Sequence, residues 1–154
     1  MLLVDLRALD DGALETQAVV PADDPLFEGM DARPVGPVQV DGRLRKTGSD
    51  AYFWSGTIRA PVMVACRRCL IEVPHELTAD VRALFTADEA SLEDPEAYEL
   101  APQARQLDLA VPVREEMVLN TPAFVLCTDE CRGLCPTCGA DLNTEQCQCT
   151  ARDD

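Results

Sequence analysis

The chain has 154 residues, 47% of them hydrophobic, and carries a formal net charge of −15 at pH 7. This length and composition predict one compact domain with a small appendage and enough apolar side chains to bury a core. The negative charge argues against generic attachment to nucleic acid or to an anionic membrane, because both depend on clustered lysines and arginines.

The N-terminal residues MLLVDLRAL are typical of a short strand and lack the basic leader of a signal peptide. Acids interrupt every hydrophobic stretch well before membrane-spanning length, so we expect a cytoplasmic protein with no membrane partner. Residues 10–37 are rich in Asp, Pro and Gly and show no hydrophobic period, which predicts a long loop or an irregular meander.

From residue 38 the hydrophobic pattern changes to a period of two, which is typical of strands. Three such runs are separated by TGSD at residues 47–50 and by CRRCL at residues 66–70. Their apolar positions are Val38, Val40 and Leu44, then Tyr52, Trp54, Ile58, Ala60, Val62 and Val64, then Ile71, Val73, Leu77, Val81 and Phe85. His75 shares the apolar face of the third run, and we interpret it as a core histidine because no second histidine exists to partner it.

Residues 86–104 contain six acids, no base and two prolines, which predicts an acidic linker or exposed loop. The next segment, LDLAVPVREEMVLNTP, predicts one short amphipathic helix with Asp108 as N-cap, Pro112 in its first turn and Pro122 beyond its end. We therefore predict a β-rich domain at 1–85 with a CxxC turn at 66–69, a linker or loop at 86–104, a helix packing on the sheet at 105–122, and a cysteine-rich, zinc-ribbon-like segment at 123–150. The predicted fold is α+β, with an antiparallel β-meander or barrel-like core.

Eight cysteines form four close pairs, three of them between positions 127 and 149. The pairs are Cys66 with Cys69, Cys127 with Cys131, Cys135 with Cys138, and Cys147 with Cys149. In a reducing cytosol such pairs hold metal or do redox chemistry more often than they form disulfides. Zinc prefers four soft ligands in a tetrahedron, which two close pairs supply when they meet in space.

The third and fourth pairs are close enough in sequence to form one four-cysteine zinc site, and Gly139 suits the left-handed turn that follows such a pair. The first and second pairs would then form another site, joining the strand turn to the segment after the helix. Spacing alone leaves two alternatives open. One is a single site with spare thiols, and the other is an exchanged grouping in which the first pair meets the third.

Catalytic interpretations have less support in the residues. A redox CxxC needs a lowered thiol pKa at a helix N-terminus, whereas CRRC lies between predicted strands, although Arg67 and Arg68 favour a thiolate. The chain also lacks a deaminase zinc motif and a glycine-rich phosphate loop. We therefore predict a protein that is not an enzyme, with structural zinc and no small-molecule substrate. The alternatives are a zinc-ribbon adaptor between proteins in transcription or translation, and a CxxC thiol oxidoreductase.

Basic residues are concentrated in the middle of an acidic chain. Between positions 43 and 82 there are seven bases against four acids, and these bases are Arg43, Arg45, Lys46, Arg59, Arg67, Arg68 and Arg82. We interpret them as part of a solvated strand face. The alternative is a local patch that contacts RNA or another partner.

Three segments together resemble the bacterial YceD family, known as large ribosomal RNA subunit accumulation proteins. They are the alternating region ending in CRRCL, the helical segment LDLAVPVREEMVLNTP and the cysteine-rich segment LCTDECRGLCPTCGADLNTEQCQC. The resemblance implies a non-enzymatic cytoplasmic factor that supports synthesis, processing or accumulation of 23S ribosomal RNA. It places the first six cysteines on family motif positions, while Cys147 and Cys149 match the form of the family with a complete C-terminal ribbon.

The resemblance and the net charge point to different modes of binding. The basic residues would contact ribosomal RNA directly, or the acidic body would bind a basic ribosomal protein or a pre-50S particle. We favour the second mode, because complementary electric fields speed the encounter with a basic partner.

Overall fold

The computed structural model describes residues 2–149. Within them, a six-stranded sheet has the order β2-β4-β5-β6-β7, and β3 pairs with β5 beside this path. The strands are β2 (Ala13–Val20), β3 (Arg33–Pro34), β4 (Val38–Gly48), β5 (Ala51–Ala65), β6 (Glu72–Thr86) and β7 (Ala97–Glu99). A second, two-stranded sheet pairs β1 (Leu3–Asp5) with β8 (Gln106–Asp108).

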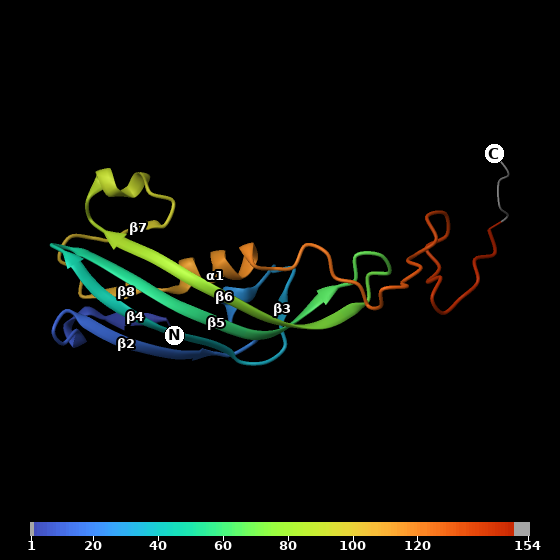
Figure 1. The fold of residues 1–154 in the computed structure, drawn as a ribbon, viewed down its shortest axis with the longest axis horizontal. Helices are drawn as coiled ribbons and strands as arrows, with labels where there is room; N and C mark the ends of the chain where they lie inside the picture. The colour runs from blue at the N-terminus through green and yellow to red at the C-terminus, as the bar shows by residue number, and fades with distance from the viewer. Residues whose placement is uncertain (1, 150–154) are drawn as a thin grey trace.

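The helical elements of the described chain are short. They are the α-helix α1 (Ala110–Leu119) and the 3-10 helices η1 (Leu6–Ala8), η2 (Pro25–Phe27) and η3 (Glu89–Glu93). Figure 1 shows long, twisted strands with α1 lying along them and the cysteine-rich segment extending beyond one end of the sheet. No helix of residues 2–149 is long and apolar enough to cross a membrane.

Strands β4, β5 and β6 form the antiparallel meander that their alternating sequences predict. In β5 the even-numbered residues 52, 54, 58, 60, 62 and 64 are buried, while the odd-numbered ones are half-buried or exposed. The sheet therefore has a core face, which packs against α1 and the β1–β8 pair, and an opposite face, which we call the open face. The α+β class is confirmed, with mostly strands and one α-helix in the described residues.

Trp54 is the largest fully buried side chain on the core face. The Trp54 side chain is fully buried, and its indole Nε1 donates a 2.8 Å hydrogen bond to Thr16 Oγ1 on β2. To reach across β4 the ring passes over Gly42 and Gly56, which lie opposite each other in the β4–β5 register. A Cβ atom at either glycine would lie 2.5–2.6 Å from an indole carbon, so the ring depends on both positions lacking a side chain.

Three expectations are corrected. Residues 10–37 are not a long loop, because they contain β2, an edge strand that pairs with β4 along eight residues. The core is not barrel-like, because β2 and β7 end the sheet path without pairing with each other in the described chain. His75 is exposed rather than buried, because it lies near the start of β6, before Leu77, which is the first buried residue of that strand.

The segments on either side of β8 fold back onto the sheet. Residues 86–104 contain η3 and the short β7, which runs parallel to β6, and Leu100 is buried at the end of this segment. In α1 the side chains of Pro112, Val113 and Met117 are buried. The Asp108 carboxylate accepts a 2.9 Å hydrogen bond from the Ala110 amide, which satisfies one free donor at the start of the helix.

Candidate metal centres

The turn between β5 and β6 presents the first pair of cysteines. The Cys66 amide donates to the Ile71 carbonyl at 2.7 Å, and the Leu70 amide donates to the Cys66 carbonyl at 3.0 Å, which closes a tight loop. Leu70 has a φ of 64°, so this turn uses a left-handed residue. The Arg67 amide donates to the Val125 carbonyl at 2.8 Å, and this contact brings the segment after α1 to the loop.

The first and second pairs meet and form what we call the first cluster. Its sulfurs, all within 4.8 Å of one another, belong to Cys66, Cys69, Cys127 and Cys131. The Sγ atoms of Cys66 and Cys131 are 3.7 Å apart, and those of Cys69 and Cys127 are 3.6 Å apart. A zinc–sulfur bond of about 2.3 Å in a tetrahedron requires sulfurs about 3.8 Å apart, whereas a disulfide bond is about 2.0 Å long. The distances fit a shared metal ion.

The third and fourth pairs form the second cluster, made of Cys135, Cys138, Cys147 and Cys149. The Cys147 sulfur lies 3.2 Å from that of Cys135 and 3.6 Å from that of Cys138. The Gly139 amide donates to the Cys135 carbonyl at 2.9 Å, and Gly139 has a φ of 75°. As its place in the sequence predicts, this glycine supplies the left-handed residue of the loop.

The structure thus gathers the eight thiols in the grouping that their sequence positions favour. It does not place the first pair beside the third, and it leaves none of the eight outside a cluster. Each cluster could hold one metal ion, and an all-sulfur set of four ligands is compatible with zinc. CRRC lies in a strand-to-strand turn, away from the helix N-terminus that a redox dithiol uses.

Thiolates are stabilised by hydrogen bonds inside each cluster. Backbone amides at Cys69 and Cys127 lower the pKa of the Cys66 thiol to about 6, and the Cys127 amide donates to its sulfur at 3.3 Å. The Cys138 amide and the Cys147 thiol lower the pKa of Cys135 to about 6. Each cluster therefore holds one thiol that ionises near neutral pH, which prepares it for a cation.

Asn143 is a site residue that the sequence interpretation missed. Its side-chain amide donates to the Cys131 sulfur at 3.4 Å and lowers the pKa of that thiol. Its side-chain oxygen accepts a 2.9 Å hydrogen bond from the Arg132 amide. Because Asn143 lies between Cys138 and Cys147 in the chain, it links the loop of the second cluster to a ligand of the first. The signal was its position in GADLN, between two cysteine pairs.

Apart from the cysteines, the distal segment has little core. The small buried cluster at this end of the molecule consists of Cys66, Cys69 and Cys131, with Val73, Leu126, Cys127 and Leu134 packed around them. Arg68 adds a 3.0 Å hydrogen bond from its guanidinium to the Cys131 carbonyl. So few apolar side chains offset little of the entropy that is lost when the segment becomes ordered.

The seven bases predicted as candidate RNA or partner contacts do not form one patch. By strand register, Arg43, Arg45, Arg59 and Arg82 lie on the open face, Lys46 lies on the opposite face near the end of β4, and Arg67 and Arg68 lie in the cysteine turn. All seven are exposed. The open face also carries acids, and Glu15 lies 3.4 Å from the Arg43 guanidinium while Glu96 lies 4.0 Å from that of Arg82.

Fold and clusters together define a small α+β protein with an open antiparallel sheet and two four-cysteine candidate metal centres. Residues 54–154 match the family described as "Large ribosomal RNA subunit accumulation protein YceD". The match covers about two thirds of the sequence and all eight cysteines, and the chain belongs to this family. The resemblance seen in the sequence is thereby confirmed.

Proteins of other organisms are similar to parts of the chain, and two of them carry the same description. A Mycobacterium tuberculosis protein named as uncharacterized is 32% identical over 99 residues, 63% of this chain and 48% of that protein. A Zea mays protein named "Large ribosomal RNA subunit accumulation protein YCED homolog 1, chloroplastic" is 27% identical over 164 residues, 82% of this chain and 53% of that protein. An Arabidopsis thaliana protein of the same name is 21% identical over 124 residues, 61% of this chain and 38% of that protein.

The chain spans about half the length of the first two of these relatives. No solved structure matches it.

Proposed function

We propose that the chain is a non-enzymatic ribosome biogenesis factor that supports synthesis, processing or accumulation of 23S ribosomal RNA by binding. The observation that carries this proposal is the match of residues 54–154 to a family named for accumulation of the large ribosomal RNA. That name describes an effect on RNA level and states no chemical reaction. The two plant relatives carry the same description.

Both clusters are proposed to bind zinc in a structural role. Four sulfurs would complete a tetrahedron around each ion, which leaves no open coordination position for a substrate or an activated water. The ions would instead supply free energy that folds a segment with almost no apolar core. As part of this proposal, the chain consists of a β-rich domain at 1–85, a linker or loop at 86–104, a helix at 105–122 and a cysteine-rich segment at 123–150.

The partner proposed here is a basic ribosomal protein or a pre-50S particle, met in the cytoplasm. Broad contact with RNA requires a concentrated basic surface, because each phosphate contact replaces condensed counterions with a lysine or arginine. The seven bases between positions 43 and 82 are divided among two faces and a turn, and the whole chain carries a net charge of −15. These features support a basic protein as the main contact, with direct contact to ribosomal RNA limited to the open-face arginines.

Depletion of the protein in its own cells tests the function. Mature 23S RNA should fall relative to 16S RNA, and 23S precursors should accumulate or be degraded. Re-expression of the wild-type chain should restore the ratio. Purified zinc-loaded protein should leave 23S precursor RNA intact on prolonged incubation. An unchanged 23S to 16S ratio after complete depletion would contradict the proposed role, and cleavage of the RNA would contradict the non-enzymatic part.

A further inference from the structure

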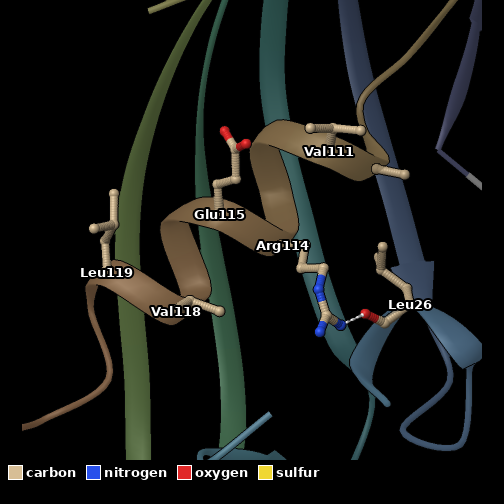
Figure 2. Close-up of a pocket in the computed structure, with 7 residues that line it drawn as sticks. Leu26, Val111, Arg114, Glu115, Val118 and Leu119 are labelled. Atoms are coloured by element: carbon tan, nitrogen blue, oxygen red, sulfur yellow. Dashed lines mark hydrogen bonds between the residues drawn. The ribbon is translucent and has the colours of Figure 1, made fainter. Parts of the chain in front are cut away.

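Helix α1 has a second apolar side that the sheet does not cover. Val111, Val118 and Leu119 are 54%, 51% and 75% exposed, although the opposite side of the helix is buried. Positions 111, 115, 118 and 119 follow the helical period and so form a stripe along one side. Figure 2 shows Val111 at one end of the helix and Val118 and Leu119 at the other, with Glu115 between them.

The stripe forms one wall of a groove. An open cavity of about 560 Å³ lies between α1 and Leu26 of η2, and its lining is mostly apolar, with Arg114 and Glu115 as the charged side chains. The Arg114 guanidinium crosses the base of this groove and donates to the carbonyls of Leu26 and Glu28, as Figure 2 shows for Leu26. These bonds hold η2 against the helix, so the groove is held open by the fold.

The groove does not end at the helix C-terminus. A second hollow shares Val118 with it and continues past Thr121 and Pro122 to Val125 and Arg67, beside the first cluster. The ten residues of α1 alone span about 15 Å, enough to accept two to three turns of another helix. The size and shape suit an elongated segment of a protein better than a compact small molecule.

Acidic side chains flank the groove. On the β7 side, Tyr98 Oη donates a 2.6 Å hydrogen bond to Glu115 Oε2. The pKa of Tyr98 is raised mainly by burial, then by this hydrogen bond and by the nearby carboxylates of Glu115, Glu116 and Glu96, which lie on this side of the groove. On the other side, the η2 region at residues 21–31 contains four acids and no base.

We propose that this groove docks a basic amphipathic helix of a partner protein, with the apolar face of that helix on Val111, Val118 and Leu119 and its lysines or arginines toward the acidic banks. The proposal deepens the proposed function, on which the choice of a basic partner rests. Two bases also line the groove, Arg114, whose guanidinium is bound to the carbonyls of η2, and Arg67 at the far end. Phosphates of RNA would meet only these two bases and would be repelled by the more numerous acids of both banks. A second copy of this chain would bring its own acidic banks against the same charges.

Binding of a designed probe to the zinc-loaded full chain tests the groove. The probe is a synthetic helix of about 18 residues with leucines on one face and lysines on the other, and its matched controls carry glutamate for lysine or a scrambled order. The lysine probe should bind and perturb the amide resonances of residues 110–119. The doubly substituted Val118→Ser, Leu119→Ser variant should bind it at least about tenfold more weakly.

Val19→Ser is the control variant, because Val19 is 62% exposed but lies on the open face. It should bind the probe as the wild type does. The proposal is overturned if the groove variant binds equally well, if the glutamate probe binds as tightly, or if the perturbed resonances lie on β4 and β5. Mapping on the wild-type chain keeps the test decisive if the groove variant does not fold.

Two further outcomes name other occupants and would also overturn the proposal. One is a concentration-dependent dimer that the groove substitutions dissociate. The other is perturbation of residues 110–119 by a 23S RNA fragment rather than by the lysine probe. The depletion experiment separates the two levels of inference. A fall in 23S RNA without probe binding rejects only the groove, whereas probe binding without a fall in 23S RNA rejects only the ribosomal role.

Discussion

At the scale of single residues, the core depends on two glycines under the Trp54 indole. A Cβ at Gly56 would lie 2.5 Å from the Asp41 carbonyl oxygen and 2.5 Å from an indole carbon. We expect Gly56→Ala to lower the free energy of unfolding by about 1–3 kcal/mol, because neither a backbone oxygen nor a buried ring can move aside freely. Denaturant unfolding of the zinc-saturated protein measures this difference.

Gly48→Ala is the matched control for that substitution. A Cβ there would meet only Ala51 Cβ, at an ordinary 3.7 Å, so its unfolding midpoint should stay near that of the wild type. Equal midpoints for the Gly56 and Gly48 variants would contradict the position of the Trp54 indole over Gly56.

Asn143 should tune the first cluster without being one of its ligands. Asn143→Ala removes the hydrogen bond to Cys131 Sγ, and we expect zinc affinity at that cluster to fall by about tenfold, as is common when a group that orients a ligand is lost. Competition with a chromophoric chelator measures the affinity. Asn120→Ala, at the end of α1, should leave it unchanged. If the Asn143 variant binds zinc as tightly as the wild type in competition with the chelator, Asn143 does not support the first cluster.

Zinc affinity should depend on pH because protons compete for the sulfurs. The pKa of Cys66 is lowered to about 6, so its thiolate is present at neutral pH and is lost as the pH falls through that value. The Ile71 amide favours a Cys69 thiolate, but burial and the neighbouring thiols raise the pKa of Cys69 to about 12, so zinc must displace its proton. Affinity should therefore rise with pH above about 6 and fall steeply below it.

Chelator competition across this range checks the expectation, and calorimetry in buffers of different ionisation enthalpy checks the proton release. Zinc binding with the same affinity at pH about 5 and pH about 8 is the result that would exclude thiolate ligands.

At the scale of elements, the distal segment and the sheet should respond differently to metal removal. Residues 127–149 have few apolar contacts of their own, whereas β4, β5 and β6 are held by a core that contains no sulfur ligand. Stripping zinc should therefore release amide protection in residues 127–149 and preserve it in the strands. Hydrogen exchange with chelator, compared with chelator plus excess zinc, measures both regions. Unchanged protection in residues 127–149 would contradict the structural role of the metal.

The sequence predicts a strand well where the strand has one clearly buried apolar side, and poorly where it does not. Strands β4, β5 and β6 are recognisable because apolar residues recur at every second position along most of the buried side of each, although Gly42 and Gly56 interrupt the pattern in β4 and β5. Strand β2, ALETQAVV, escapes recognition because it is an edge strand whose inward side combines large apolar residues with Thr16 and Ala18, and Thr16 accepts the hydrogen bond of the Trp54 indole. The three residues of β7 pair only through their contact with β6, which no local pattern encodes.

The candidate site was also predicted only in part from the sequence. The cysteine spacings predict close pairs, but which pairs meet depends on where α1 delivers the chain. The Arg67 to Val125 hydrogen bond places the second pair beside the β5–β6 turn, and this contact joins residues far apart in sequence. The uncovered stripe on α1 was not predicted, because Leu109, Val113 and Met117 already account for an amphipathic helix. A second apolar side becomes visible only when the first is seen to be buried.

At the scale of the whole molecule, different surfaces lie on different sides. The open face of the sheet carries four arginines interspersed with acids, and the apolar groove lies along α1 on the opposite side of the sheet. The cysteine-rich segment with its two clusters extends beyond one end of the sheet (Figure 1). Such an arrangement suits a binding protein that presents different surfaces to different neighbours, since charged surfaces select partners mainly by complementarity.

The central claim is that two metal ions hold the distal segment in place. Native mass spectrometry of full-length protein purified without chelator tests it most directly. The predicted mass exceeds that of the polypeptide by two zinc ions less the protons displaced from the eight thiols, and acid should return the mass of the reduced chain. A mass that shows no metal, or one lowered by the hydrogens lost in disulfide formation, would contradict the account.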